Sequence, residues 1–234
     1  MAIHTVFLDA GGILVHPNWS RVSETMERHG VLVTAKALSD AEPRAKQRLD
    51  RGETIQGTND EQRGWAYFDL VLTEAGVPLT ASTAAALVEL NAYHRQFNLW
   101  ETVPDDVRPA LAALRARGLR LVVVSNANGT LLNMFTRLGL VGALDVVFDS
   151  HVVGIEKPDP RFFRHALEQS GARAETTVHV GDLYHVDVMG ARAAGIAAIL
   201  LDAGNLYTDY DCPRVRTIGE VVDLIATMSG NERC

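Results

Sequence analysis

Four short segments of the chain combine residue types that can bind an anion, bind a metal ion or act as a nucleophile. Carboxylates suit nucleophilic attack and hard cations, whereas hydroxyl, amide and ammonium groups suit phosphoryl oxygens. Glycines beside such groups let backbone N–H groups turn toward an anion. The segments are, in chain order, Asp9-Ala10-Gly11-Gly12, Ser125-Asn126, Lys157 ahead of Pro158-Asp159-Pro160, and the acidic run from Gly181-Asp182 to Asp187.

The acidic run is the most specific of these signals. Asp182 ends a predicted strand, and Asp187 follows in the next turn. Two carboxylates placed in this way can converge on one cation, and hard oxygen ligands suit Mg²⁺. The sequence therefore predicts a metal site at the end of this strand.

The elements that must position these segments form an alternating pattern of short apolar runs and amphipathic helices. Such alternation is typical of a doubly wound α/β fold with a parallel sheet. The carboxyl ends of parallel strands share one edge of the sheet, where such proteins bind ligands. We therefore expect Asp9, Ser125 and Asp182 to lie together. The predicted strands are 3–9, 119–125, 145–148, 177–182 and 196–202.

Residues 16–100 interrupt the alternation with helical patterns alone. The first two predicted helices are 18–29 and 34–51, the second broken at Pro43. The third opens on a capping box of Thr58 and Glu61, and the fourth runs from Thr80 to about residue 96. We expect a small all-helical cap domain over 16–100, inserted after strand one of a core domain formed by 1–15 and 101–234.

Composition excludes several classes of protein. The 234 residues carry a formal net charge of −7 with no basic block, which argues against a nucleic-acid partner. The two cysteines, Cys212 and Cys234, form no disulfide framework. No apolar run approaches the ~20 residues that span a bilayer, and no signal segment is evident. We expect a cytoplasmic protein, as a monomer or a homodimer, without a membrane partner.

In this order the four segments resemble the motifs of the haloacid dehalogenase (HAD) superfamily. That family has a strand-end nucleophilic Asp, a strand-end Ser or Thr, a Lys, and a GDxxxxD-type acidic motif. Here they read FLDAGG, VVSNAN, EKPDP and GDLYHVD. The resemblance covers the whole chain, and the insert after the first motif resembles the family's helical C1-type cap. It implies a Rossmann-like core in which the strands ending at Asp9 and Asp182 are neighbours.

The resemblance also implies an activity, the Mg²⁺-dependent hydrolysis of a small phosphorylated metabolite. Asp9 would attack phosphorus and form an aspartyl-phosphate that water hydrolyses, with Lys157 offsetting charge repulsion. Mg²⁺ would be held by Asp9, the Gly11 carbonyl and Asp182, with Asp187 behind them or bound through water. The implied phosphate-binding residues are Ala10, Gly11, Ser125, Asn126 and Lys157.

One position departs from the family pattern. Family phosphatases carry a general acid/base Asp two residues after the nucleophile, and here that residue is Gly11. Such catalysis is worth about 10²–10⁴-fold. Either the substrate has a good leaving group, as in anomeric, acyl or aryl phosphates, or His16 or His185 takes the role. The remaining alternatives are a metal-free C–X hydrolase of the dehalogenase type, which the acidic motif disfavours, and a catalytically silent binding protein.

The cap is expected to set specificity. Arg63 or Arg95 is suited to contact an anionic substrate, although packing between cap and core explains the aromatic residues more simply. The candidates are Trp19, Arg63, Trp65, Tyr67, His94, Arg95, Asn98 and Trp100.

Overall fold

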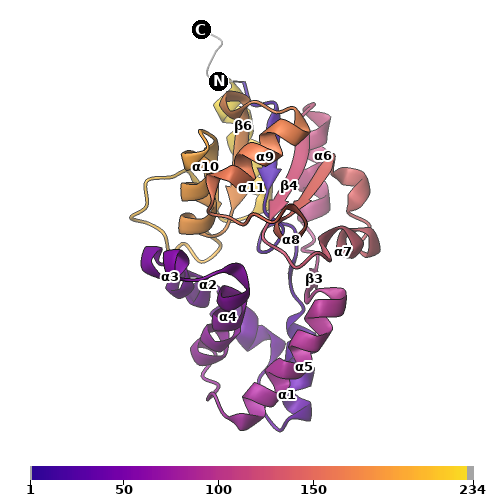
Figure 1. The fold of residues 1–234 in the computed structure, drawn as a ribbon, viewed down its shortest axis with the longest axis vertical. Coiled ribbons are helices and arrows are strands. Elements are labelled where there is room, and N and C mark those ends of the chain that lie inside the picture. The colour runs from indigo at the N-terminus through magenta and orange to yellow at the C-terminus, as the bar shows by residue number, and fades with distance from the viewer. Residues whose placement is uncertain (1, 231–234) are drawn as a thin grey trace.

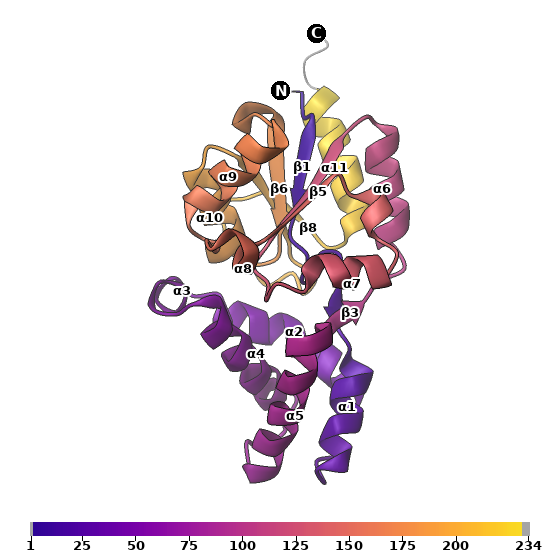
Figure 2. The same cartoon turned by 45° about the vertical axis from the view of Figure 1, so that its right-hand side comes forward.

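The structure, a computed structural model, describes residues 2–230; Cys234 lies outside this range. A six-stranded parallel sheet has the order β5-β4-β1-β6-β7-β8, and Figures 1 and 2 show helices on both of its faces. This confirms the predicted fold class. The strands are β1 (Thr5–Leu8), β4 (Arg120–Ser125), β5 (Val146–Asp149), β6 (Thr177–Gly181), β7 (Ala197–Leu201) and β8 (Arg214–Val215).

The five predicted strands are all present, and the short edge strand β8 is an addition. Strand β1 lies between β4 and β6, so Leu8 has Val123 on one side and Val180 on the other. The expected pairing of the strands ahead of Asp9 and Asp182 is therefore confirmed. This register brings the carboxyl ends of three strands to one edge of the sheet.

Successive side chains of β1 alternate between two apolar layers. Val6 and Leu8 pack with α6 (Val107–Ala116), α7 (Leu131–Arg137) and α11 (Ile218–Gly230). Phe7 packs on the opposite face with α9 (Pro160–Ser170) and α10 (Met189–Ala193). Burial on both faces explains why these strands read as continuous apolar runs. The remaining short helices of the core are α8 (Ser150–Val153), η1 (Val141–Ala143), η2 (Ala174–Thr176) and η3 (Tyr184–Val188).

The segment between β1 and α6 forms a separate group of helices below the sheet (Figure 2). It has its own apolar cluster, to which Trp19, Leu38, Phe68 and Leu90 belong. An antiparallel pair, β2 (His16–Pro17) and β3 (Trp100–Thr102), connects it to the core. The helices are α1 (Trp19–Arg28), α2 (Ala35–Leu49), α3 (Gly52–Gly57), α4 (Asp60–Glu74) and α5 (Ala81–Phe97). The division of the chain at 16 and 100 stays a prediction.

Two local predictions in this segment are wrong. Helix α2 continues through Pro43. The proline leaves the Ser39 carbonyl without a backbone N–H partner, but Ser39 is exposed to solvent. The buried face formed by Leu38, Ala41 and Ala45 stays continuous. The cap of α4 is one residue later than Thr58. Asn59 accepts from the backbone N–H of Gln62 at 2.9 Å, and the Gln62 side chain accepts from the backbone N–H of Asn59 at 3.1 Å.

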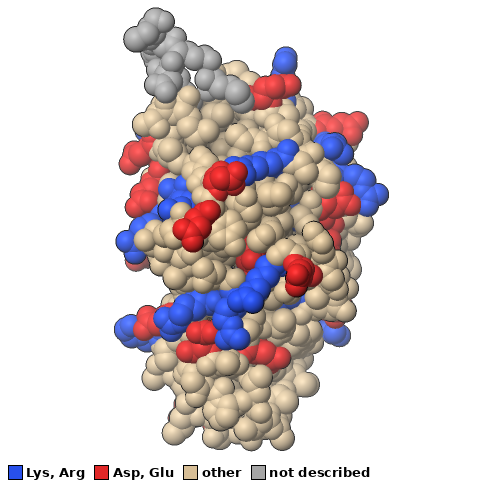
Figure 3. Space-filling view, turned by 90° about the vertical axis from the view of Figure 1, so that its left-hand side faces the viewer, with Lys and Arg blue, Asp and Glu red and all other residues tan. Residues whose placement is uncertain are grey.

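The surface carries charges of both signs. On the face in Figure 3, Lys and Arg side chains interleave with Asp and Glu across the middle, and the lower end is mostly uncharged. This face has no continuous basic field of the kind that binds nucleic acid. Within residues 2–230, none of the helices combines the length and the apolar character needed to cross a membrane.

Candidate active site

The four segments meet at a cleft of about 760 Å³ between the sheet edge and the cap helices. Asp9 follows β1, Ser125 ends β4 and Asp182 follows β6, as their positions in the sequence predict. Asp187 is completely buried and lies behind the cleft wall. The predicted site residues that line the cleft are Asp9, Ala10, Gly11, Ser125, Asn126, Lys157 and Asp182.

Lys157 is the buried cation of the site. Its Nζ lies 3.0 Å from Asp9 Oδ1 and 2.7 Å from Asp187 Oδ1. Burial alone would lower the pKa of Lys157, but Asp187 and Asp9 outweigh it and raise the pKa above its ordinary value. The ammonium group therefore stays charged, and together with the backbone N–H of Ala10, 2.8 Å from Oδ1, it fixes the Asp9 carboxylate.

Asn126 holds the backbone of Lys157 on both sides. Its Oδ1 accepts from the Lys157 N–H at 2.7 Å, and its Nδ2 donates to the Lys157 carbonyl at 3.0 Å. This side chain is therefore engaged in positioning Lys157. A phosphate contact from Asn126 would use its backbone N–H. The Ser125 hydroxyl, which faces the cleft, donates to the Asn126 carbonyl at 3.3 Å.

Asp187 organises the acidic loop. Its Oδ2 accepts from the backbone N–H groups of Asp182 at 3.2 Å and Leu183 at 3.0 Å. Its Oδ1 faces Lys157 and also lies 3.0 Å from His179 Nε2. Burial would raise the pKa of Asp187, but Lys157 and His179 outweigh it and hold the pKa below its usual range. His179 was not among the residues predicted from the sequence; the available signal is its place within the continuously apolar strand β6, two residues before Gly181.

The three carboxylates form the one cluster of potential metal ligands among the described residues. Asp9, Asp182 and Asp187 each place an oxygen within 4.8 Å of the others. Burial, with added repulsion from Asp9 and Asp187, raises the pKa of Asp182 to about 6 despite the attraction of Lys46. A hard cation would relieve this repulsion, so the donor set fits a divalent ion such as Mg²⁺.

Lys46 brings a second buried ammonium group from the cap, which the sequence did not indicate. Its Nζ lies 2.7 Å from Asp182 Oδ2 and 2.7 Å from Glu42 Oε1. Burial alone would lower the pKa of Lys46, but the carboxylates of Asp182 and Glu42 raise it above its ordinary value. The backbone at Gly12 has φ of +76°, and a Cβ there would lie 1.9 Å from Asp182 Oδ2, so this position requires glycine.

Position 11 has limited room for a side chain. A Cβ on Gly11 would lie 3.3 Å from both Cδ1 and Nε1 of Trp100. The two histidines considered as substitutes do not line the cleft. His16 Nδ1 lies 3.9 Å from Glu42 Oε2, and His185 Nδ1 lies 3.2 Å from Asp50 Oδ1.

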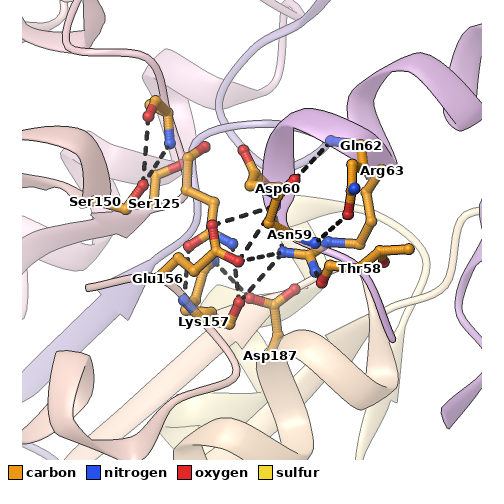
Figure 4. A network of polar contacts seen from close by, with 12 residues as sticks. Thr58, Asn59, Asp60, Gln62, Arg63, Ser125, Ser150, Glu156, Lys157 and Asp187 are labelled. Atoms are coloured by element: carbon orange, nitrogen blue, oxygen red, sulfur yellow. Dashed lines mark hydrogen bonds and ion pairs between the residues drawn. The ribbon is translucent and has the colours of Figure 1, made fainter. Parts of the chain in front are cut away.

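The cap residue Arg63 connects cap and core (Figure 4). Its Nη1 donates to the Thr58 carbonyl at 2.5 Å, and its Nη2 lies 3.4 Å from Glu156 Oε1. The backbone N–H of Asp60 donates to the same Glu156 carboxylate at 3.2 Å. Arg63 is therefore engaged in holding the cap against the Lys157 segment. Of the other cap candidates, the cleft is lined by Trp65, Tyr67, His94, Arg95, Asn98 and Trp100, whereas Trp19 lies apart from it.

Comparison with known proteins identifies the class of this molecule. Residues 3–195 match the family model of haloacid dehalogenase-like hydrolases. The human haloacid dehalogenase-like hydrolase domain-containing protein 3 is 31% identical over 80% of this chain and 76% of its own length. Its mouse counterpart aligns over 54% of this chain and half of its own length. The chain belongs to the haloacid dehalogenase-like hydrolase family.

A phosphatase relative and a solved structure give further information on function and fold. The glyceraldehyde 3-phosphate phosphatase of Methanothermobacter thermautotrophicus is 32% identical over 57% of this chain and 74% of its own length. The HAD-hydrolase YfnB of Bacillus subtilis, bound to magnesium, superposes with a TM-score of 0.71 at 17% identity, over 96% of this chain and 99% of that one. The structural likeness shows the fold. The phosphatase relatives support a phosphatase function for this hydrolase.

Proposed function

We propose that this protein hydrolyses phosphate monoesters of small molecules, with Mg²⁺ as its cofactor and Asp9 as the nucleophile. The observation that carries the proposal is the geometry of Asp9. Its carboxylate lines an open cleft, is fixed by a buried ammonium group 3.0 Å away, and lies beside two further carboxylates. Phosphoryl transfer requires this combination of a positioned nucleophile and charge neutralisation.

The residues of the chain divide the work of the reaction. Asp9 attacks phosphorus as the P–O bond to the leaving group breaks, and the leaving oxygen departs with the electron pair and takes a proton from solvent. Water then hydrolyses the aspartyl-phosphate, which frees phosphate and restores Asp9. Lys157 orients Asp9 and offsets the repulsion between its carboxylate and the anionic substrate. The Ser125 hydroxyl and the backbone N–H of Gly11 would bind phosphoryl oxygens, and the backbone N–H of Ala10 would join them only by leaving Asp9 Oδ1. Asp187 positions Lys157 from behind.

The carboxylates of Asp9 and Asp182, with the Gly11 carbonyl, would hold Mg²⁺. Asp187 would contact the ion only through water, because both of its oxygens already accept hydrogen bonds. When bound, Mg²⁺ neutralises charge on the phosphoryl group. Its binding requires Asp182 to leave its direct contact with Lys46 or to share its two oxygens between the two cations.

The second candidate function is cleavage of a carbon–halogen bond. A haloacid substrate carries a carboxylate, and every Lys and Arg that lines the cleft within residues 2–230 is already paired with a carboxylate. The acidic cluster also has no role in a metal-free reaction. Release of halide from 2-haloacids in the presence of EDTA would establish this alternative in place of phosphatase activity.

A catalytically silent binding protein is the third candidate, and one variant distinguishes it. Asp9→Asn should abolish phosphate release from a panel of aryl, acyl and alkyl phosphates while leaving the fold intact. Asp105→Asn, which alters an exposed carboxylate outside the cleft, is the matched control and should retain activity. Phosphate release that requires Mg²⁺, stops with EDTA and is lost only in Asp9→Asn supports the proposal. Equal release by the two variants would remove Asp9 as nucleophile. We further propose a cytoplasmic location, on the basis of the cysteine content.

A further inference from the structure

The charges that line the cleft limit which charged groups a substrate can carry besides the phosphate that is removed. The described lining has four cationic side chains, Lys46, Arg63, Arg95 and Lys157, against five carboxylates, Asp9, Asp60, Glu61, Glu156 and Asp182. Each of the four cations lies within 4.0 Å of at least one carboxylate. A second phosphate or a carboxylate on the substrate would therefore compete with a carboxylate already in place for each of these cations, so the cleft offers a second anion no dedicated partner.

The cap side of the cleft offers aromatic and aliphatic surface. Trp100 is at the centre of this surface, with ring centroids of Tyr67 and Phe68 both 5.7 Å away and that of His94 5.4 Å away. Burial lowers the pKa of His94 to about 4, so this ring is neutral near pH 7. Trp65, Leu87 and Leu90 extend this surface on the cap side, and Leu131 and Met134 of α7 face the cleft from the core side.

Trp100 also lies beside position 11, the position at which family phosphatases carry a general acid. Its Cδ1 and Nε1 atoms are 3.3 Å from the position of a Cβ on Gly11, two residues after Asp9. The indole therefore covers the space beside the nucleophile, and no carboxylic acid protonates the leaving oxygen from that position. An indole N–H is too weak an acid to do so at neutral pH. This arrangement favours a leaving group that departs as a stable anion.

From these two features we infer that the substrate is an aryl phosphate, the monoester of a phenol-like hydroxyl, with no second negative charge, and that Trp100 selects it. The inference rests on the proposed function and names its substrate class. Asp9 attacks phosphorus, the P–O bond to the aryl group breaks, and the phenolate leaves with the electron pair and takes a proton from solvent. Its ring packs against Trp100, and water hydrolyses the aspartyl-phosphate.

Four phosphates separate leaving-group quality from ring packing. Phenyl phosphate has both a stabilised leaving group and a ring, and acetyl phosphate has the leaving group without the ring. Glycerol 3-phosphate has neither, and 3-phosphoglycerate adds a carboxylate to a similar alkyl phosphate. With Mg²⁺ present, kcat/KM for phenyl phosphate should exceed that for glycerol 3-phosphate by about 100-fold or more, the range that general acid catalysis would otherwise supply. The compound 3-phosphoglycerate should be the poorest substrate.

Trp100→Leu removes the aromatic ring but keeps an apolar side chain in strand β3, which connects the cap to the core. It should raise KM for phenyl phosphate about three- to tenfold, as loss of an aromatic contact predicts, and leave KM for acetyl phosphate unchanged. Trp100→Phe should retain the preference for phenyl phosphate, and it covers the case in which leucine perturbs the fold. Circular dichroism of each variant checks folding.

The possible failures are distinguishable. If glycerol 3-phosphate or 3-phosphoglycerate is hydrolysed as fast as phenyl phosphate, the substrate class is wrong but the proposed phosphatase function is retained. If Trp100→Leu changes KM for phenyl and acetyl phosphate equally, Trp100 is not the selecting residue. If no compound releases phosphate with Mg²⁺, the proposed function fails and the substrate class with it.

Discussion

Two buried lysines of this protein make the same kind of contact in two different settings. Lys157 bridges Asp9 and Asp187, and all three residues belong to the core. Lys46 bridges Asp182 of the core and Glu42 of the cap. The first bridge lies within the core, whereas the second joins the core to the cap. The nucleophile is therefore fixed by core residues, whereas the cation beside Asp182 comes from the cap.

The surroundings of the two lysines reinforce this difference. Asn126 clamps the backbone of Lys157 with two hydrogen bonds, and His179 supports Asp187 from within strand β6. Lys46 lies one helical turn after Glu42, whose carboxylate accepts from Tyr67 at 2.9 Å and from Trp19 at 3.3 Å. The charge of Lys157 is therefore fixed within the core, whereas the charge of Lys46 is supplied by the cap.

The largest expected effect is that of Lys157→Met. It leaves the buried Asp187 without its cation, and breaking such a buried pair costs about 3–5 kcal/mol of folding free energy. Phosphate release should fall at least as far as in Asp9→Asn. Urea denaturation and the phosphate assay measure the two effects. A stable and active Lys157→Met protein would contradict the role assigned to the core bridge.

The next effect concerns acid sensitivity of the cap. Burial holds the pKa of His94 at about 4, below its ordinary 6.5, so the unfolded chain takes up a proton before the folded one does. This contribution to stability is fully present above pH 6.5 and is lost as the pH falls to 4. At about 1.4 kcal/mol per pKa unit it amounts to at most about 3 kcal/mol. His94→Gln should lose less stability between pH 7 and pH 4 in thermal unfolding, and an identical loss would remove His94 as the cause.

A smaller effect is expected for Lys46→Met, the counterpart of the core variant. It leaves Glu42 with its two uncharged donors and releases Asp182 from a competing cation. The cost in folding free energy should be about 1–3 kcal/mol, less than for Lys157→Met. Titration calorimetry should show tighter Mg²⁺ binding than in the wild type. Weaker Mg²⁺ binding would mean that Lys46 orients Asp182 for the metal instead of competing with it.

The smallest effect is expected for Gly11→Asp alone. The new side chain restores a carboxylic acid beside Asp9, but its Cβ forces the Trp100 ring to move by a few tenths of an ångström. The rate on alkyl phosphates should rise less than about tenfold, well short of the full effect of general acid catalysis. In the double variant Gly11→Asp/Trp100→Ala, the rate on alkyl phosphates should rise further. Equal rates for the single and double variants would show that Trp100 does not restrict position 11.

The sequence predicted the core side of this comparison far better than the cap side. Asp9, Ser125 and Asp182 follow strands whose apolar runs are unambiguous, and parallel pairing brings strand ends to one edge. Their meeting at one cleft could therefore be predicted. A role for Lys157 could be predicted only from the family resemblance, because a lysine before a Pro-Asp-Pro turn is by itself an ordinary surface residue.

The contacts of the cap residues could not be predicted, because they depend on how the cap helices pack against each other and against the core. Nothing in the amphipathic pattern of α2 distinguishes Lys46 from Lys36, an exposed lysine of the same helix. The Glu42 carboxylate is covered by residues of α1 and α4, which the local sequence does not reveal. His185 is held by Asp50 for the same reason. The continuity of α2 through Pro43 likewise follows from tertiary packing that local propensity does not record.

The central claim is that phosphate passes through Asp9. The direct measurement is to mix the enzyme with Mg²⁺ and phenyl phosphate, reduce any acyl phosphate with borohydride, and analyse the peptide that contains Asp9 by mass spectrometry. We expect the Asp9 carboxyl group to be reduced to an alcohol only when substrate is present, and no such product from Asp9→Asn. Phosphate release at an undiminished rate from Asp9→Asn, with no reduced Asp9 in the wild type, would contradict it.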